Sequence, residues 1–121
     1  MRETEGRSTS PTAEEPPSLD LIFELLSDQR RRYVLYYLTE QPDGVATVDE
    51  VTDVVATRRA EKRDQEPETV RDQIRTSLQH VHLPKLEAAG LLEHDRRSET
   101  VRYWSQPSLE EWVEHAQYKE F

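Results

Sequence analysis

The chain has 121 residues, with 25 acidic side chains against 16 Lys and Arg, so its formal net charge is −9. This length fits a single domain. The absence of cysteine excludes disulfides, thiolate metal ligands and thiol nucleophiles. No apolar run approaches the roughly 20 residues that cross a bilayer, so we expect a soluble, cytoplasmic protein with no membrane association.

The first 18 residues, MRETEGRSTSPTAEEPPS, combine three prolines with many charges and almost no apolar side chains. Such a segment buries too little surface to offset the entropy lost on ordering. It also lacks the long apolar stretch of a secretory signal. We therefore predict a disordered tail over residues 1–18.

Apolar spacing predicts two short helices after this tail. The first has one apolar face, with Ser18 placed as its N-cap, and the face consists of Leu19, Ile22, Phe23 and Leu26. The second restarts after Ser27 and Asp28, and its inward side chains are Val34, Leu35 and Leu38, flanked by Tyr33 and Tyr37. The turn sequence QPDG at 41–44 ends it.

The sequence TVDE at 47–50 is a capping box, which predicts the start of a third helix. The apolar positions of this helix are Val48, Val51, Val54 and Val55. Just before it, Val45 and Ala46 favour a very short strand. Residues 57–66 are almost entirely polar, and we interpret them as either a loop or a solvated extension of the helix.

A fourth helix is predicted from Pro67, which suits a first helical turn. Its apolar positions are Val70, Ile74, Leu78 and Val81. Pro84 cannot donate a helical hydrogen bond and clashes with the preceding turn, so we expect a kink near residues 80–83. Gly90 supplies the left-handed residue that ends the helix.

A β-hairpin and a last helix follow. Apolar and polar residues alternate over 91–94 and 101–104, on either side of the polar turn DRRSET at 95–100. The sequence SLEE at 108–111 is a second capping box and predicts a helix over 108–120. The expected fold class is mainly α with a small β-hairpin.

Three helices closed by a hairpin resemble a winged helix-turn-helix domain. The stretch HLPKLEAAGLLEHD at 82–95 resembles the end of the recognition helix and the first wing strand of ArsR-type regulators. Together with LLSDQRRRYVLYYL at 25–38, it resembles an uncharacterised family of haloarchaeal winged-helix domains. The resemblance covers residues 19–105 and implies a winged helix with an added C-terminal helix at 106–121.

The composition also resembles that of proteins from extreme halophiles, because the chain is acidic and uses Arg far more than Lys. An ordinary acidic protein is the alternative. In salt near 1 M the Debye length shrinks to about 3 Å, so the repulsion within an acidic chain is screened.

The resemblance implies that the fourth helix reads double-stranded DNA. A step of 100° per residue places Arg75, Thr76 and Gln79 on the face opposite the apolar stripe. These residue types contact base edges and phosphates. The alternative is an ordinary solvated face.

The predicted hairpin and second helix hold further arginines. Arg96, Arg97 and Arg102 are candidate phosphate contacts, with pairing across the hairpin to Asp95 and Glu99 as the alternative. Three more candidates lie in the first turn of the second helix, where the helix dipole disfavours positive charge, and these are Arg30, Arg31 and Arg32. Their alternative role is pairing with Asp28, Glu24 or the acidic tail.

No catalytic or metal motif is evident. His80 and His82 would stand about 200° apart on a regular helix and could not share one ion there. A metal site formed through the kink, with His94 as a third ligand, is the alternative. No phosphate loop, nucleophile elbow or HExxH motif occurs. We therefore expect no enzyme activity, no metal and no cofactor.

The last helix presents an apolar face that consists of Leu109, Trp112, Val113 and Ala116. This face predicts a homodimer interface, and packing within the chain onto the first helix is the alternative. The predicted function is a dimeric, DNA-binding transcriptional regulator adapted to high salt. The alternative is a winged-helix protein–protein interaction module that does not bind DNA.

Overall fold

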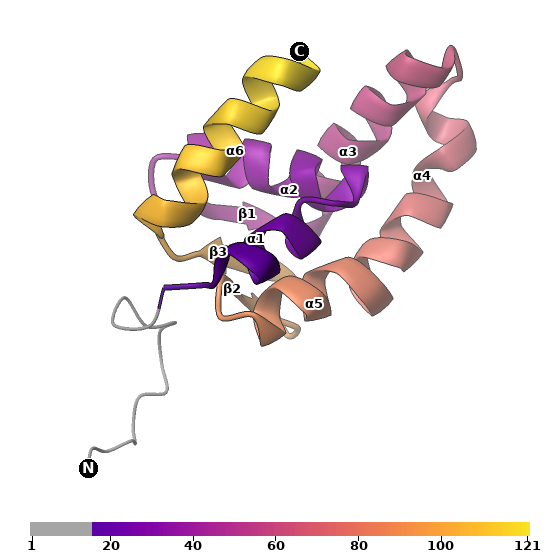
Figure 1. The fold of residues 1–121 in the computed structure, drawn as a ribbon. Coiled ribbons are helices and arrows are strands. Elements are labelled where there is room, and N and C mark those ends of the chain that lie inside the picture. Colours follow the sequence, from indigo (N-terminus) through magenta and orange to yellow (C-terminus); the bar gives the residue numbers. More distant parts are fainter. Residues whose placement is uncertain (1–15) are drawn as a thin grey trace.

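The computed structural model describes residues 16–121, so most of the predicted tail lies outside the described part. The described chain is mainly helical, with one small antiparallel sheet and a helix at its C-terminal end, as expected (Figure 1). The helices are α1 (Leu19–Leu25), α2 (Gln29–Glu40), α3 (Val48–Arg63), α4 (Pro67–Ser77), α5 (Leu83–Ala88) and α6 (Pro107–Glu120), and the strands are β1 (Val45–Thr47), β2 (Leu92–Asp95) and β3 (Thr100–Tyr103). Within residues 16–121, none of the helices combines the length and apolar character that a membrane span requires.

Helix α1 begins at the predicted cap, where the Ser18 hydroxyl accepts a hydrogen bond from the Leu21 backbone N–H. Its buried face differs from the prediction, because Ile22 and Leu25 are buried while Leu19 and Phe23 remain about half exposed. The guanidinium of a buried arginine in α2 binds the last carbonyls of α1 and draws its C-terminal turn inward. The apolar face of α1 is therefore wider than the part of it that is buried against the core.

Helix α3 starts with the predicted capping box, in which the Glu50 N–H donates to the Thr47 hydroxyl and the Thr47 N–H donates to the Glu50 carboxylate. The helix continues to Arg63, so most of the polar segment 57–66 is an extension of the helix and not a loop. Buried Ala60 anchors that extension. Asp64, with a φ of 56°, ends it in the left-handed conformation.

The expected interruption before Pro84 takes the form of a π-helical turn, η2 (Leu78–His82), between α4 and α5. The Leu83 N–H donates to the Leu78 carbonyl, so the turn contains one extra residue. His82 and Leu83 therefore face the core while Val81 points out and is 51% exposed. The predicted apolar stripe is wrong at Val81 for this reason.

The sheet has the order β1-β3-β2, so the short β1 pairs with the second hairpin strand. Gly44 fixes this pairing: its carbonyl accepts from the Tyr103 N–H at 2.8 Å and its φ is +71°. A Cβ there would lie 2.8 Å from the Tyr103 carbonyl oxygen, so only glycine fits. The left-handed Gly90 ends α5 as predicted and turns the chain into β2.

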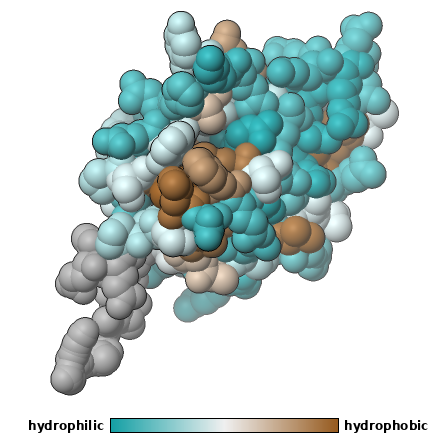
Figure 2. All heavy atoms as spheres, viewed as in Figure 1, coloured by the Kyte–Doolittle hydropathy of each residue, from teal (hydrophilic) through white to brown (hydrophobic). Residues whose placement is uncertain are grey.

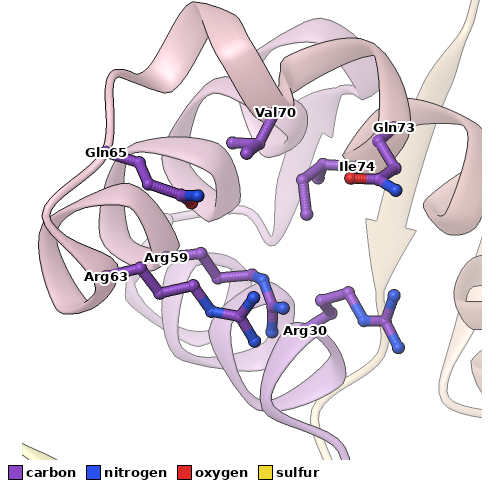
Figure 3. Close-up of a pocket in the computed structure, with 7 residues that line it drawn as sticks. All are labelled: Arg30, Arg59, Arg63, Gln65, Val70, Gln73 and Ile74. Carbon is purple, nitrogen blue, oxygen red and sulfur yellow. The ribbon is translucent and has the colours of Figure 1, made fainter.

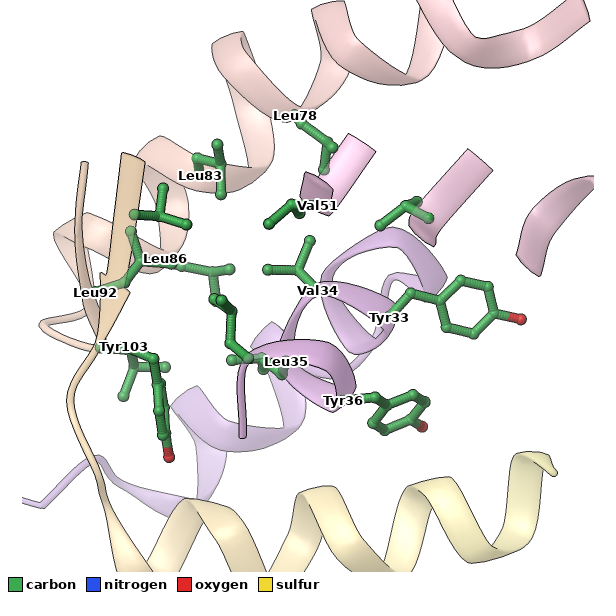
Figure 4. Close-up of a cluster of buried hydrophobic side chains, with 14 of the residues drawn as sticks. Tyr33, Val34, Leu35, Tyr36, Val51, Leu78, Leu83, Leu86, Leu92 and Tyr103 are labelled. Carbon is green, nitrogen blue, oxygen red and sulfur yellow. The ribbon is translucent and has the colours of Figure 1, made fainter. Parts of the chain in front are cut away.

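The core lies where α2, α3 and the curved α4–η2–α5 segment meet the sheet (Figure 4). All three side chains predicted to point inward from α2 are buried. Tyr36, also buried, was not predicted. From the other elements, Leu78, Leu83 and Leu92 point into the same cluster.

Helix α6 begins earlier than predicted, at Pro107, with Gln106 as the N-cap residue and no side-chain cap. The second capping box is therefore wrong, because proline favours the first helical position and Ser108 falls inside the helix. Leu109 and Val113 are fully buried against their own chain, with Ala116 beside them. The prediction that Leu109 and Val113 are dimer contacts is therefore wrong, and the alternative, packing within the chain, is correct for these two residues.

Candidate nucleic-acid interface

The polar face of α4 and η2 meets the tip of the hairpin. Arg75 lies between Asp49 of α3, to which its guanidinium donates, and Glu99 of the hairpin, 3.7 Å away. Gln79 donates to the same Glu99 carboxylate at 3.2 Å. Thr76 is exposed on this face. Arg75 and Gln79 thus lie beside the hairpin tip, and Thr76 is exposed between them in the sequence.

The hairpin tip is held by its two acidic residues. The Asp95 carboxylate accepts from the Arg97 and Ser98 backbone N–H groups, and these hydrogen bonds lower the pKa of Asp95. Glu99 adopts a φ of 55°, and its carbonyl accepts from the Val48 N–H at 2.9 Å. The tip is therefore fastened to the start of α3 by its backbone and to α4 and η2 by a side chain.

The three hairpin arginines have different surroundings. Arg96 extends back to Glu87 of α5 at 3.3 Å, with 58% of its side chain exposed. Arg97 is exposed, and no described acidic side chain pairs with its guanidinium. The Arg102 guanidinium lies 5.5 Å from the centre of the Trp104 ring. The pairing across the hairpin that was the alternative for these residues is not formed in the described chain.

Helices α3 and α4 are joined by ion pairs that were not predicted from the sequence. Arg71 contacts Asp53 at 2.6 Å and Asp49 at 3.5 Å. Each partner set has a spacing of four residues, Asp49 with Asp53 and Arg71 with Arg75, so each set lies on one helical face. This matched spacing was the feature of the sequence from which the ion pairs between α3 and α4 could have been predicted.

The three arginines at the start of α2 have separate partners. Arg30 donates twice to Asp28, as the alternative foresaw. Arg32 donates twice to Glu120 of α6 at 2.8 Å. Arg31 is only 6% exposed and donates to the carbonyls of Leu25 and Glu24. The prediction that Arg31 contacts DNA is wrong, because its guanidinium is buried against the C-terminal carbonyls of α1.

Buried His82 is a further partner of Arg31, with its Nδ1 3.1 Å from the guanidinium. Burial lowers the pKa of His82 to about 4, and the nearby arginines add to this against the opposing charge of Asp28. Since arginine carries only donors, Nδ1 must be the acceptor and the ring is neutral. His80, by contrast, is exposed, and within residues 16–121 no three His, Asp or Glu side chains are placed to hold a metal ion.

The chain belongs to the family described as Domain of unknown function (DUF7344), whose model matches residues 23–102. The matched segment runs from α1 into β3, so it includes both elements of the candidate interface. No curated protein and no solved structure matches the chain.

Proposed function

We propose that this chain is a winged-helix DNA-binding protein that acts as a transcriptional regulator in the cytoplasm of a salt-adapted archaeon, and not as an enzyme. In this assignment α2, α3 and the α4–η2–α5 segment are the three helices of the module. Strands β2 and β3 form the wing, and β1 completes its sheet. The recognition helix would enter the major groove while the wing lies along the backbone.

One observation carries the proposal: the Glu99 carboxylate lies beside both Arg75 and Gln79. The wing tip and the polar face of the recognition helix therefore form one continuous surface. On it, Thr76 and Arg97 are exposed, and the Arg96 guanidinium remains accessible to solvent. Arginine suits phosphate because its planar fork donates two hydrogen bonds at once.

The acidic residues on this surface set its affinity. Asp49 and Asp53 are 68% and 62% exposed in their pairs with α4 arginines. Exposed ion pairs of this kind contribute between 0 and about 1 kcal/mol each. Arg71 and Arg75 could therefore exchange a carboxylate for a DNA phosphate at small cost, and molar salt screens the two kinds of contact alike.

The direct test is fluorescence anisotropy with mixed genomic duplexes over a KCl series that reaches molar concentration. We expect saturable binding that persists at molar salt, where charge attraction alone is lost. Binding confined to dilute buffer, or no binding, would contradict the proposal.

The wing is tested by reversing Arg96 and Arg97 to Glu together. Duplex binding should be abolished, because two phosphate contacts become repulsive. The melting temperature should stay nearly unchanged, since the variant loses an exposed ion pair with Glu87 and one long hydrogen bond, 3.4 Å, to the His94 carbonyl. The matched control reverses the exposed Lys62 and Lys119, which carries the same change in net charge. Equal binding by the two variants would remove the wing from the mechanism.

A second candidate function, protein binding, is favoured by a separate apolar surface. Phe23 and Trp112 meet edge to face, 5.1 Å between ring centres, and are 48% and 37% exposed. With Leu19, they connect α1 to the predicted dimer helix. Figure 2 shows hydrophobic residues gathered on this face over the region of α1. A homodimer through this surface would retain Trp112 from the predicted interface and could present two recognition helices about 34 Å apart.

A further inference from the structure

Three arginines line a small cavity on a different part of the molecule from the wing. Arg59 and Arg63 extend from α3 and Arg30 from the start of α2, facing Val70 and Ile74 of α4 across the opening (Figure 3). The amides of Gln65 and Gln73 also line it. The cavity has a volume of about 200 Å³.

The positive charge here is under-compensated. Arg30 is paired with Asp28, but Arg59 donates to the neutral Gln29 amide, and no described acidic side chain pairs with Arg63. Burial lowers the pKa of Arg59, and the charges of Arg63 and Arg30 lower it further. Of these three guanidinium groups only that of Arg30 is paired with a carboxylate, although the chain has a net charge of −9.

The cavity's contents match the needs of an oxyanion. Guanidinium groups and side-chain amides supply donors from several directions, and the arginine fork fits phosphate oxygens in pairs. At roughly 30 Å³ per water molecule, the space admits one phosphate group with a few waters. It is smaller than the roughly 300 Å³ that a drug-sized ligand requires.

We propose that this cavity binds a phosphate group through Arg59, Arg63 and Arg30, with Gln65 and Gln73 as further donors. The phosphate could come from a small molecule or from a DNA backbone. The inference does not depend on DNA binding, because it rests on the cavity and its unpaired charge.

The test is isothermal titration of the full chain with inorganic phosphate at constant ionic strength, with KCl as the balancing salt. The wild-type chain should bind one phosphate, and Arg63→Gln should weaken the affinity on the order of tenfold, the loss of one charge-assisted interaction. Arg63 anchors no described carboxylate, so this variant should keep the fold. Lys62→Gln is the matched control, because it removes the same charge from the neighbouring exposed position.

Arg59→Lys provides a second variant, which keeps the charge and removes the fork, and its affinity should fall between those of wild type and Arg63→Gln. A heat signal no different from that of added KCl would overturn the proposal, as would equal weakening by Lys62→Gln.

A duplex arm identifies the source of the phosphate. If Arg63→Gln weakens inorganic phosphate and spares duplex affinity, the ligand is a small molecule. If both fall together, the cavity holds a backbone phosphate. Phosphate binding without any duplex binding would overturn the DNA-binding proposal alone.

Discussion

Arginine side chains have different roles in two regions of this molecule. Beneath α1 and α6, Arg31 and Arg32 are largely enclosed, and they bind backbone carbonyls and the Glu120 carboxylate. On α4, Arg71 and Arg75 contact Asp53 and Asp49, whose side chains are more than 60% exposed. An enclosed charge without its partner is costly, whereas an exposed one turns to water. The first set therefore stabilises the fold, whereas the partners of the second set remain largely exposed to solvent.

The largest effect should come from acid titration of the enclosed region at His82. Its pKa is about 4 in the fold and 6.5 as a free side chain, so below pH 6.5 the unfolded chain takes up the proton first. Stability should fall by roughly 3 kcal/mol as the pH drops from 6.5 to 4. Urea denaturation at several pH values in constant salt measures this. His82→Asn places an amide oxygen near the position of Nδ1, so it keeps an acceptor for Arg31 and should flatten the slope. An unchanged slope would assign the protons to other groups.

The next effect should follow from Glu120→Ala, which removes the acceptor of the buried Tyr36 hydroxyl and of two of the hydrogen bonds that Arg32 donates. The hydrogen bonds from Arg32 lower the pKa of Glu120 to about 2, so the carboxylate is charged at neutral pH. We expect a loss of about 2 kcal/mol in the free energy of unfolding. Glu111→Ala, on the exposed side of the same helix, should lose less than about 0.5 kcal/mol. Similar losses for the two variants would mean that the contact contributes little.

The smallest stability effect should be that of Asp53→Asn on the exposed region. The Arg71 pair is exposed, so the free energy of unfolding should change by less than about 0.5 kcal/mol. If α4 contacts phosphate, the same variant should bind duplex DNA more tightly, because Arg71 no longer has that competitor. Denaturation and anisotropy measured on one preparation separate the two results. Weaker duplex binding would contradict exchange of ion-pair partners.

Local chemistry was enough to predict several features of the fold. The Ser18 cap, the Thr47 and Glu50 capping box and the Gly90 helix end depend on residues within a few positions of one another. The inward face of α2 follows from helical spacing alone. The predicted break before Pro84 also follows, since a missing N–H acts at a fixed distance along the chain.

The errors arose where distant segments decided the outcome. Val81 faces solvent because the extra residue of the π turn brings His82 and Leu83 to the core. Leu109 and Val113 are equally apolar on a dimer helix and on a packed one, so spacing could not choose between them. Nothing in the sequence distinguishes Arg31 from Arg30 and Arg32, because only the fold brings the α1 carbonyls beside its guanidinium.

The sequence by itself determined the helices, the hairpin, the main turns and the acidic balance of this protein, because these depend on nearest neighbours and composition. Only the tertiary structure decided which arginines are enclosed, which are paired on the surface, and which three line one cavity. Those roles depend on which carboxylates and carbonyls the fold brings within hydrogen-bond distance, and partners up to 88 residues apart in the chain carry no local signal.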